Sequence, residues 1–239
     1  MRRVFETIRS LLIWMIAFPL FSLSCLVILI TAFVYRGRRL EVLIKTCCRI
    51  ILFSAGIRVR RHGAENIAPG RRYILMMNHV NFLDPMVFYS RYPGRARGIE
   101  EERHFHWPLY GPMLRRIGMI PVDRIHSRKA RESLNRAADL IRSREDFSVL
   151  VLPEGTRTPD GKLGPFKRGG FLLAREAGLD ILPIVQVGAY RINHKGSRLL
   201  RPGRIEYIIE APIASPGTSK EDLAVWMDRV RAVFASHLE

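Results

Sequence analysis

Hydrophobic and polar positions divide the chain into an apolar N-terminal part and a longer part of mixed character. No charged residue occurs from Leu11 to Tyr35, and a second apolar segment runs from Leu40 to Phe53. A helix rises about 1.5 Å per residue, so the first segment is long enough to cross a hydrocarbon core of roughly 30 Å. The pattern predicts either a single membrane span or a helical hairpin that dips into one leaflet.

Basic residues stand on both sides of the first apolar segment, so the positive-inside rule favours neither orientation. These flanking cations are Arg2, Arg3, Arg9, Arg36, Arg38 and Arg39. The second segment carries Lys45 and Arg49 four residues apart, on one face of a helix. We expect both to face an anionic lipid surface together with the flanking cations. Residues 1–54 are thus predicted to be a membrane anchor, and residues 55–239 one further domain.

Beyond this anchor, short β-type runs alternate with amphipathic segments. The runs predict strands at 57–61, 73–77, 147–152, 181–187 and 204–210. Apolar positions with helical spacing predict helices at 127–142 and 220–238. Strands separated by helices indicate an α/β fold.

Composition adds a strongly basic balance to this picture. The 239 residues include 39 Lys and Arg against 22 Asp and Glu, a net charge of +17, and 48% are hydrophobic. The apolar fraction excludes a disordered chain, while the charge predicts an anionic partner: nucleic acid, a phospholipid surface or a phosphorylated substrate. The cysteines are too few and too poorly placed for a disulfide scaffold, which favours a reducing, cytosol-facing location. They are Cys25, Cys47 and Cys48.

The segment MMNHVNFLDP places Asn78, His79 and Asp84 at the end of a predicted strand. Loops after strand ends carry reactive groups in α/β folds, and a histidine oriented by a carboxylate is a typical general base. Residues five apart do not share a helix face, so His79 and Asp84 meet only if a turn or a helix start intervenes. Pro85 favours such a boundary. The alternative is a turn or helix cap with no chemical role.

Residues 151–170, VLPEGTRTPDGKLGPFKRGG, lead from another predicted strand into a basic loop. Gly155 permits an unusual backbone turn, and Arg157 offers a planar fork for phosphate oxygens. The segment is not a nucleotide P-loop, because Leu163 stands where Ser or Thr is required. We predict a phosphate-binding loop, with a solvated basic turn as the alternative. Its polar and basic positions are Glu154, Gly155, Thr156, Arg157, Lys167 and Arg168.

Four segments in this order resemble the blocks of the glycerolipid acyltransferase family, most closely the 1-acylglycerol-3-phosphate acyltransferases. NHVNFLD at 78–84 matches the Asn-His-x4-Asp motif, and residues 103–124 match a second block that ends in Asp-Arg. LPEGTR at 152–157 matches the third block, and ILPI at 181–184 matches the fourth. The resemblance implies an α/β fold with a mixed sheet flanked by helices, preceded by an N-terminal membrane-anchoring segment.

The resemblance also implies an activity: transfer of a fatty acyl group to the sn-2 hydroxyl of 1-acylglycerol-3-phosphate, which gives phosphatidic acid. The donor would be acyl-CoA or acyl carrier protein, with no metal or redox cofactor, at the cytoplasmic face of a membrane. His79 would act as the general base and Asp84 would orient its ring. On the same resemblance, Pro183 would help shape the acyl site, and the substrate would be bound by Arg124, Glu154, Gly155, Thr156, Arg157 and Lys167.

Two alternatives to this interpretation stay open on the sequence alone. The acceptor could be glycerol-3-phosphate or an aminoacyl lysolipid. The chain could also be a non-catalytic basic protein that coats anionic membranes or nucleic acid, for which a basic stripe with exposed aromatic residues is expected. Here the distinctive arginines lie inside the motif blocks, so we expect membrane phospholipid, a lysophospholipid and a thioester donor as partners, and no nucleic acid.

Overall fold

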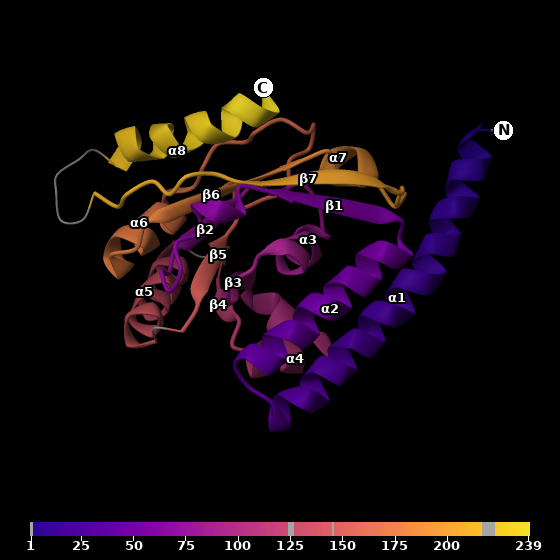
Figure 1. Ribbon diagram of the computed structural model, residues 1–239, viewed down its shortest axis with the longest axis horizontal. Helices are drawn as coiled ribbons and strands as arrows, with labels where there is room; N and C mark the ends of the chain where they lie inside the picture. The colour runs from indigo at the N-terminus through magenta and orange to yellow at the C-terminus, as the bar shows by residue number, and fades with distance from the viewer. Residues whose placement is uncertain (1, 124–126, 145, 217–222) are drawn as a thin grey trace.

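The computed structural model describes residues 2–123, 127–144, 146–216 and 223–239. Its centre is a seven-stranded sheet with the strand order β1-β7-β6-β2-β5-β3-β4. Helices cover both faces of this sheet, and the two N-terminal helices lie along one side of the molecule (Figure 1). This arrangement confirms the expected fold class, a mixed α/β sheet flanked by helices.

Five of the seven strands, β2 to β6, point in one direction, and this feature of the sheet positions the site. The seven strands are β1 (Ile57–His62), β2 (Ile74–Met77), β3 (Ala96–Glu101), β4 (Ile120–Val122), β5 (Ser148–Val151), β6 (Ile181–Val187) and β7 (Gly203–Ile209). β6 and β7 pair antiparallel, and every other neighbouring pair is parallel. The carboxyl ends of β2 to β6 therefore meet at one edge of the sheet. All five predicted strands are present, whereas β3 and β4 were not predicted.

The described helices agree with the predicted periodicity where it was strong. They are α1 (Arg2–Val34), α2 (Arg38–Ser54), α3 (Asp84–Arg91), α4 (Tyr110–Ile117), α5 (Ser127–Ser143), α6 (Arg168–Ala177), α7 (Ala189–Ile192) and α8 (Leu223–Leu238). The helix predicted at 127–142 is α5. The helix predicted at 220–238 is α8 over its described part, since 220–222 lie outside the described residues.

Two hydrophobic cores lie on the two faces of the sheet, and β2 contributes to both. Leu75 and Met77 pack into the core that α1 to α4 cover, whereas Ile74 and Met76 pack into the core that α5, α6 and α8 cover. All four side chains are fully buried. β2 therefore reads as a continuous apolar run rather than an alternating one, as a strand covered on both faces should.

The N-terminal helices α1 and α2 pack side by side and run antiparallel (Figure 1). Among the described residues, one helix is long and apolar enough to cross a membrane: Arg3–Val34. A window of 18 residues within it has a mean hydropathy of 2.5 and is 22% buried. The inner side of α1, with Cys25, Ile28 and Ala32, shares a core with α2, α3, α4 and the sheet. Because this core is continuous, the boundary between 54 and 55 stays a prediction.

Lys45 and Arg49 both bind backbone carbonyls near the end of α3, although Arg49 stays exposed and Lys45 is half-buried, so their contact with lipid stays a prediction. Lys45 Nζ donates to the carbonyls of Pro93 (2.9 Å) and Gly94 (2.7 Å), and Arg49 Nε donates to the carbonyl of Ser90 (3.0 Å). The last carbonyls of a helix lack intrahelical partners and favour cations, and these three lie at or just beyond the end of α3. The shared face of the two cations is thus the face that α2 turns toward α3. Burial lowers the pKa of Lys45.

Candidate active site

Three neighbouring parallel strands bring the polar groups of the site to one edge of the sheet. β2 lies between β5 and β6. Asn78 and His79 follow β2, Glu154 follows β5, and Gln186 stands near the end of β6. Open α/β sheets bind ligands at the carboxyl ends of such strands.

His79 and Asp84 meet across the start of α3. His79 Nδ1 lies 2.7 Å from Asp84 Oδ2, and the side chains are 15% and 0% exposed. Asp84 is the first residue of α3, so the helix start that the five-residue spacing requires is present. Because Nδ1 faces the carboxylate, Nε2 is the ring nitrogen placed to receive a proton.

The buried Asp84 carboxylate is held by further hydrogen bonds. The backbone N–H of Val80 donates to Oδ2 at 2.7 Å, and that of Asn81 lies 3.2 Å from both oxygens. Gln186 Nε2 donates to Oδ1 at 2.7 Å. Burying a carboxylate is costly unless it is hydrogen-bonded, and these donors stabilise the charge that faces His79.

Gln186 is a site residue that the sequence interpretation missed. Its Nε2 also donates to the carbonyl of Asn78 at 2.9 Å, and its backbone N–H donates to Asn78 Oδ1 at 2.8 Å. With two acceptors on one side, the amide orientation that presents Nε2 to Asp84 is the chemically consistent one. The available signal was a lone polar residue in the apolar strand ILPIVQV, whose partner lies 102 positions away.

Glu154, in the third sequence block, hydrogen-bonds to the backbone of His79. Its Oε1 accepts the backbone N–H of His79 at 2.7 Å, and its Oε2 accepts that of Gly164 at 3.0 Å. The same loop makes a further hydrogen bond to this backbone: the N–H of Thr158 donates to the carbonyl of His79 at 2.9 Å. Burial raises the pKa of Glu154, against the lowering effect of its two N–H donors. Its carboxylate is therefore engaged with backbone on both oxygens.

The loop at 154–168, which the sequence predicts to bind phosphate, exposes part of its polar side chains to solvent, whereas Thr158 is buried like Glu154. Gly155 has a φ of +68°, and a Cβ there would lie 3.2 Å from Lys167 Cγ, so glycine suits both the turn and the close approach. Thr156 and Lys167 are exposed and Arg157 is half-buried. Lys195 Nζ donates to Thr156 Oγ1 at 3.3 Å, which adds a cation that the sequence interpretation missed.

Two predicted positions remain. Arg124 lies outside the described residues. Pro183 lies buried within β6, opposite Met76 of β2. Within the described ranges, no group of three or more His, Cys, Asp and Glu side chains is placed to hold a metal ion.

The arrangement combines an imidazole on a buried carboxylate with a loop of exposed cations. Such a histidine can take a proton from a substrate hydroxyl and hold the resulting charge against the carboxylate. The cations favour an anionic group on the same substrate.

Comparison with known proteins agrees with this chemistry. Residues 58–187 match the family model described as "Acyltransferase". The 1-acyl-sn-glycerol-3-phosphate acyltransferase alpha of Bos taurus is 31% identical over 198 residues, which cover 82% of this chain and 69% of that protein. The chloroplastic 1-acyl-sn-glycerol-3-phosphate acyltransferase BAT2 of Brassica napus is 34% identical over 164 residues, which cover 67% of this chain and 46% of that protein.

The fold has a counterpart among solved structures. The crystal structure of the 1-acyl-sn-glycerophosphate acyltransferase PlsC from Thermotoga maritima superimposes with a TM-score of 0.82 at 24% identity. The match covers 100% of this chain and 96% of that one. The chain belongs to the acyltransferase family, as its four sequence blocks indicated, and it is a transferase.

Proposed function

We propose that the chain transfers a fatty acyl group from a thioester to the sn-2 hydroxyl of 1-acylglycerol-3-phosphate, producing phosphatidic acid. The observation that carries this proposal is the 2.7 Å contact between His79 Nδ1 and the buried Asp84, beside a loop of exposed cations. The family supports acyl transfer, and the names of the relatives support the acceptor.

In the proposed reaction, His79 Nε2 removes the proton of the acceptor hydroxyl while the hydroxyl oxygen attacks the thioester carbonyl. Asp84 stabilises the imidazolium that forms. The new C–O bond replaces the C–S bond, and the imidazolium returns its proton to the leaving thiolate. The acceptor itself is the nucleophile, so no acyl-enzyme forms; the three cysteines are buried in or beside the N-terminal helices.

The acceptor phosphate is proposed to bind to the cations around Thr156. Arg157 supplies a planar fork, and Lys167 and Lys195 supply point charges. Arg124 is assigned to the same phosphate, and Pro183 to the acyl site, on the family resemblance. Glu154 acts by holding the backbone of His79, and Gly155 by allowing the turn.

The donor is acyl-CoA or acyl carrier protein, and the scheme needs no metal or redox cofactor. We place the chain on the cytoplasmic face of a membrane, with the α1–α2 hairpin dipping into one leaflet. The apolar side chains that α1 exposes support this placement. They include Phe5, Ile8, Leu12, Met15, Phe18, Leu23, Ile30 and Phe33.

The test is an assay of the purified full chain with labelled acyl-CoA, or acyl carrier protein, against three acceptors. These are 1-acylglycerol-3-phosphate, glycerol-3-phosphate and an aminoacyl lysolipid. We expect labelled phosphatidic acid, with kcat/KM at least about tenfold above either other acceptor. Preference for another acceptor would overturn the proposed substrate, and labelled protein trapped without acceptor would overturn direct transfer.

A further inference from the structure

A polar stripe on the apolar helix α1 contacts a distant part of the chain. Glu6, Ser10 and Trp14 are spaced by four residues, so they share one face of the helix. All three contact the segment 198–201, which follows α7. The contacts are Glu6 Oε2 with Arg201 Nη2 (3.1 Å), Ser10 Oγ with the N–H of Leu200 (2.8 Å), and Trp14 Nε1–H with the carbonyl of Arg198 (2.9 Å).

The same segment is attached to the catalytic loop, residues 78–84, through two buried asparagines. Asn81 Nδ2 donates to the carbonyls of Ala189 (3.0 Å) and Asn193 (3.1 Å). Asn193 Nδ2 in turn donates to the carbonyls of Ser197 (3.1 Å) and Leu199 (2.9 Å). Both asparagines are at most 1% exposed. Hydrogen bonds therefore connect α1 with the catalytic loop by way of residues 189–201.

Trp14 also contacts the catalytic loop directly. Its ring stacks on that of Phe82, with centroids 5.3 Å apart and an interplanar angle of 23°. Phe82 follows Asn81, whose backbone N–H donates to Asp84 and whose Oδ1 accepts the N–H of Leu83 at 2.9 Å. Trp14 thus contacts the turn that sets Asp84 opposite His79.

We propose that α1 is a structural part of the active site and that Trp14 is a positioning residue for the catalytic loop. Trp14 acts on the loop through Phe82 and through the Arg198 carbonyl. A helix that served only as an anchor would need neither contact. The proposal rests on the proposed function for its kinetic consequence, because a loop displaced by even about 1 Å slows a reaction strongly.

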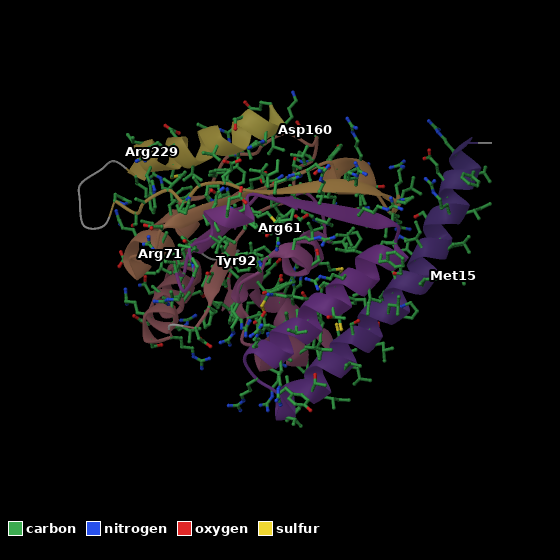
Figure 2. All side chains as sticks on the ribbon, viewed as in Figure 1. Met15, Arg61, Arg71, Tyr92, Asp160 and Arg229 are labelled. Carbon is green, nitrogen blue, oxygen red and sulfur yellow. The ribbon has the colours of Figure 1, made fainter. Side chains whose placement is uncertain are left out.

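The test compares Trp14→Ala with Trp14→Phe and with the neighbouring control Met15→Ala. Met15 is 64% exposed and points away from the rest of the molecule (Figure 2), so its loss removes apolar surface without touching the loop. Each full-length variant is assayed in detergent micelles, where bilayer attachment plays no part. Vesicle co-sedimentation measures attachment separately, with phosphatidylglycerol–phosphatidylethanolamine vesicles.

We expect Trp14→Ala to lower kcat about tenfold in micelles, with KM within about twofold and co-sedimentation like that of Met15→Ala. Trp14→Phe keeps the ring stack and loses only the Nε1–H donor, so it should keep more activity than Trp14→Ala. Met15→Ala should keep kcat. Unchanged kcat in both Trp14 variants, or a loss seen only on vesicles, would overturn the proposal.

Hydrogen–deuterium exchange gives a readout that does not depend on activity. The N–H groups of Val80 and Asn81 donate to Asp84, so they are protected while the loop holds its shape. We expect faster exchange in a peptide covering 78–84 for Trp14→Ala and Trp14→Phe, but not for Met15→Ala. Unchanged exchange in both Trp14 variants would overturn the link. A wild type that transfers no acyl group to lysophosphatidate but shows this exchange difference would contradict the proposed function alone.

Discussion

The catalytic loop and the phosphate-binding loop lie side by side, yet they differ in the exposure of the polar side chains to which we assign the chemistry. In the catalytic loop, Asn78, Asn81 and Asp84 are buried and hydrogen-bonded. In the phosphate-binding loop, Thr156 and Lys167 are exposed. On the proposed function, the groups that handle the proton are fixed before substrate arrives, whereas the groups proposed to meet an anion stay hydrated until it binds. Changes in the first loop should lower kcat, and changes in the second should raise KM.

The largest effect is expected from Asp84→Asn. An amide cannot stabilise the imidazolium as a carboxylate does, and it favours the wrong tautomer of His79. We expect kcat to fall by about 10³-fold or more, with circular dichroism unchanged. A kcat within about tenfold of wild type would show that Asp84 has only a structural role in starting α3.

Gln186→Leu should give the next largest effect. The change removes the donor to Asp84 Oδ1 and leaves that buried oxygen without its amide partner. Losing a hydrogen bond to a charged group costs about 1.5–3 kcal/mol, so kcat should fall about 30-fold with KM little changed. Gln186→Glu tests whether the donated hydrogen bond matters, because a carboxylate cannot donate to Asp84. We expect this change to lower kcat at least as much as Gln186→Leu. Full activity in both variants would remove Gln186 from the site.

Arg157→Ala should affect the other side of the comparison. We expect the KM for a phosphorylated acceptor to rise about tenfold, with kcat nearly constant, because the guanidinium meets a group that does not react. Arg157→Lys should recover part of the affinity, since it keeps the charge and loses the fork. Steady-state kinetics over a range of acceptor concentrations separates the two parameters. A loss confined to kcat would contradict the expectation that changes in the phosphate-binding loop act on KM.

Glu154→Gln should give the smallest effect, visible as a pH dependence of stability. Burial raises the pKa of Glu154 above 4.5, so the folded chain binds this proton more tightly than the unfolded chain does. Stability should therefore fall as pH rises from 4.5 through the raised value, by about 1.4 kcal/mol for each unit by which the pKa is raised. Glutamine does not titrate, so the variant should lack this contribution. Denaturant unfolding in detergent between pH 4.5 and 7 measures the stability of wild type and variant. Plots of stability against pH that run parallel for the two proteins would contradict this prediction.

The strands that the sequence predicted are those whose burial depends on their own apolar residues. β2 and β5 are buried at every position, and their apolar runs show it. β3, ARGIEE, was missed because it is polar in sequence and its buried charge is paired with a residue of another element: Arg97 is buried against Glu41 of α2. A pairing between residues 56 apart leaves no local pattern. The same reason explains why the protein contacts of Lys45 were not predicted, since its acceptors lie almost 50 residues away.

The site was predictable where its groups are close in sequence. His79 and Asp84 are five apart, and Pro85 indicated the helix start between them. Gln186 and Lys195 were missed because only the folded sheet edge brings them to Asp84 and Thr156. Trp14 looked like one more apolar residue of an anchor, although the structure stacks it on Phe82.

The turnover of His79→Ala tests the central claim most directly. The measurement is kcat for labelled acyl transfer to 1-acylglycerol-3-phosphate, on purified chain of wild-type circular dichroism. His62→Ala serves as the control, because His62 lies on the edge strand β1, where it pairs with Glu206 of β7 and does not contact His79 or Asp84. General-base catalysis predicts a fall of about 10³-fold for His79→Ala and none for His62→Ala. A His79→Ala chain that turned over near the wild-type rate would contradict the account.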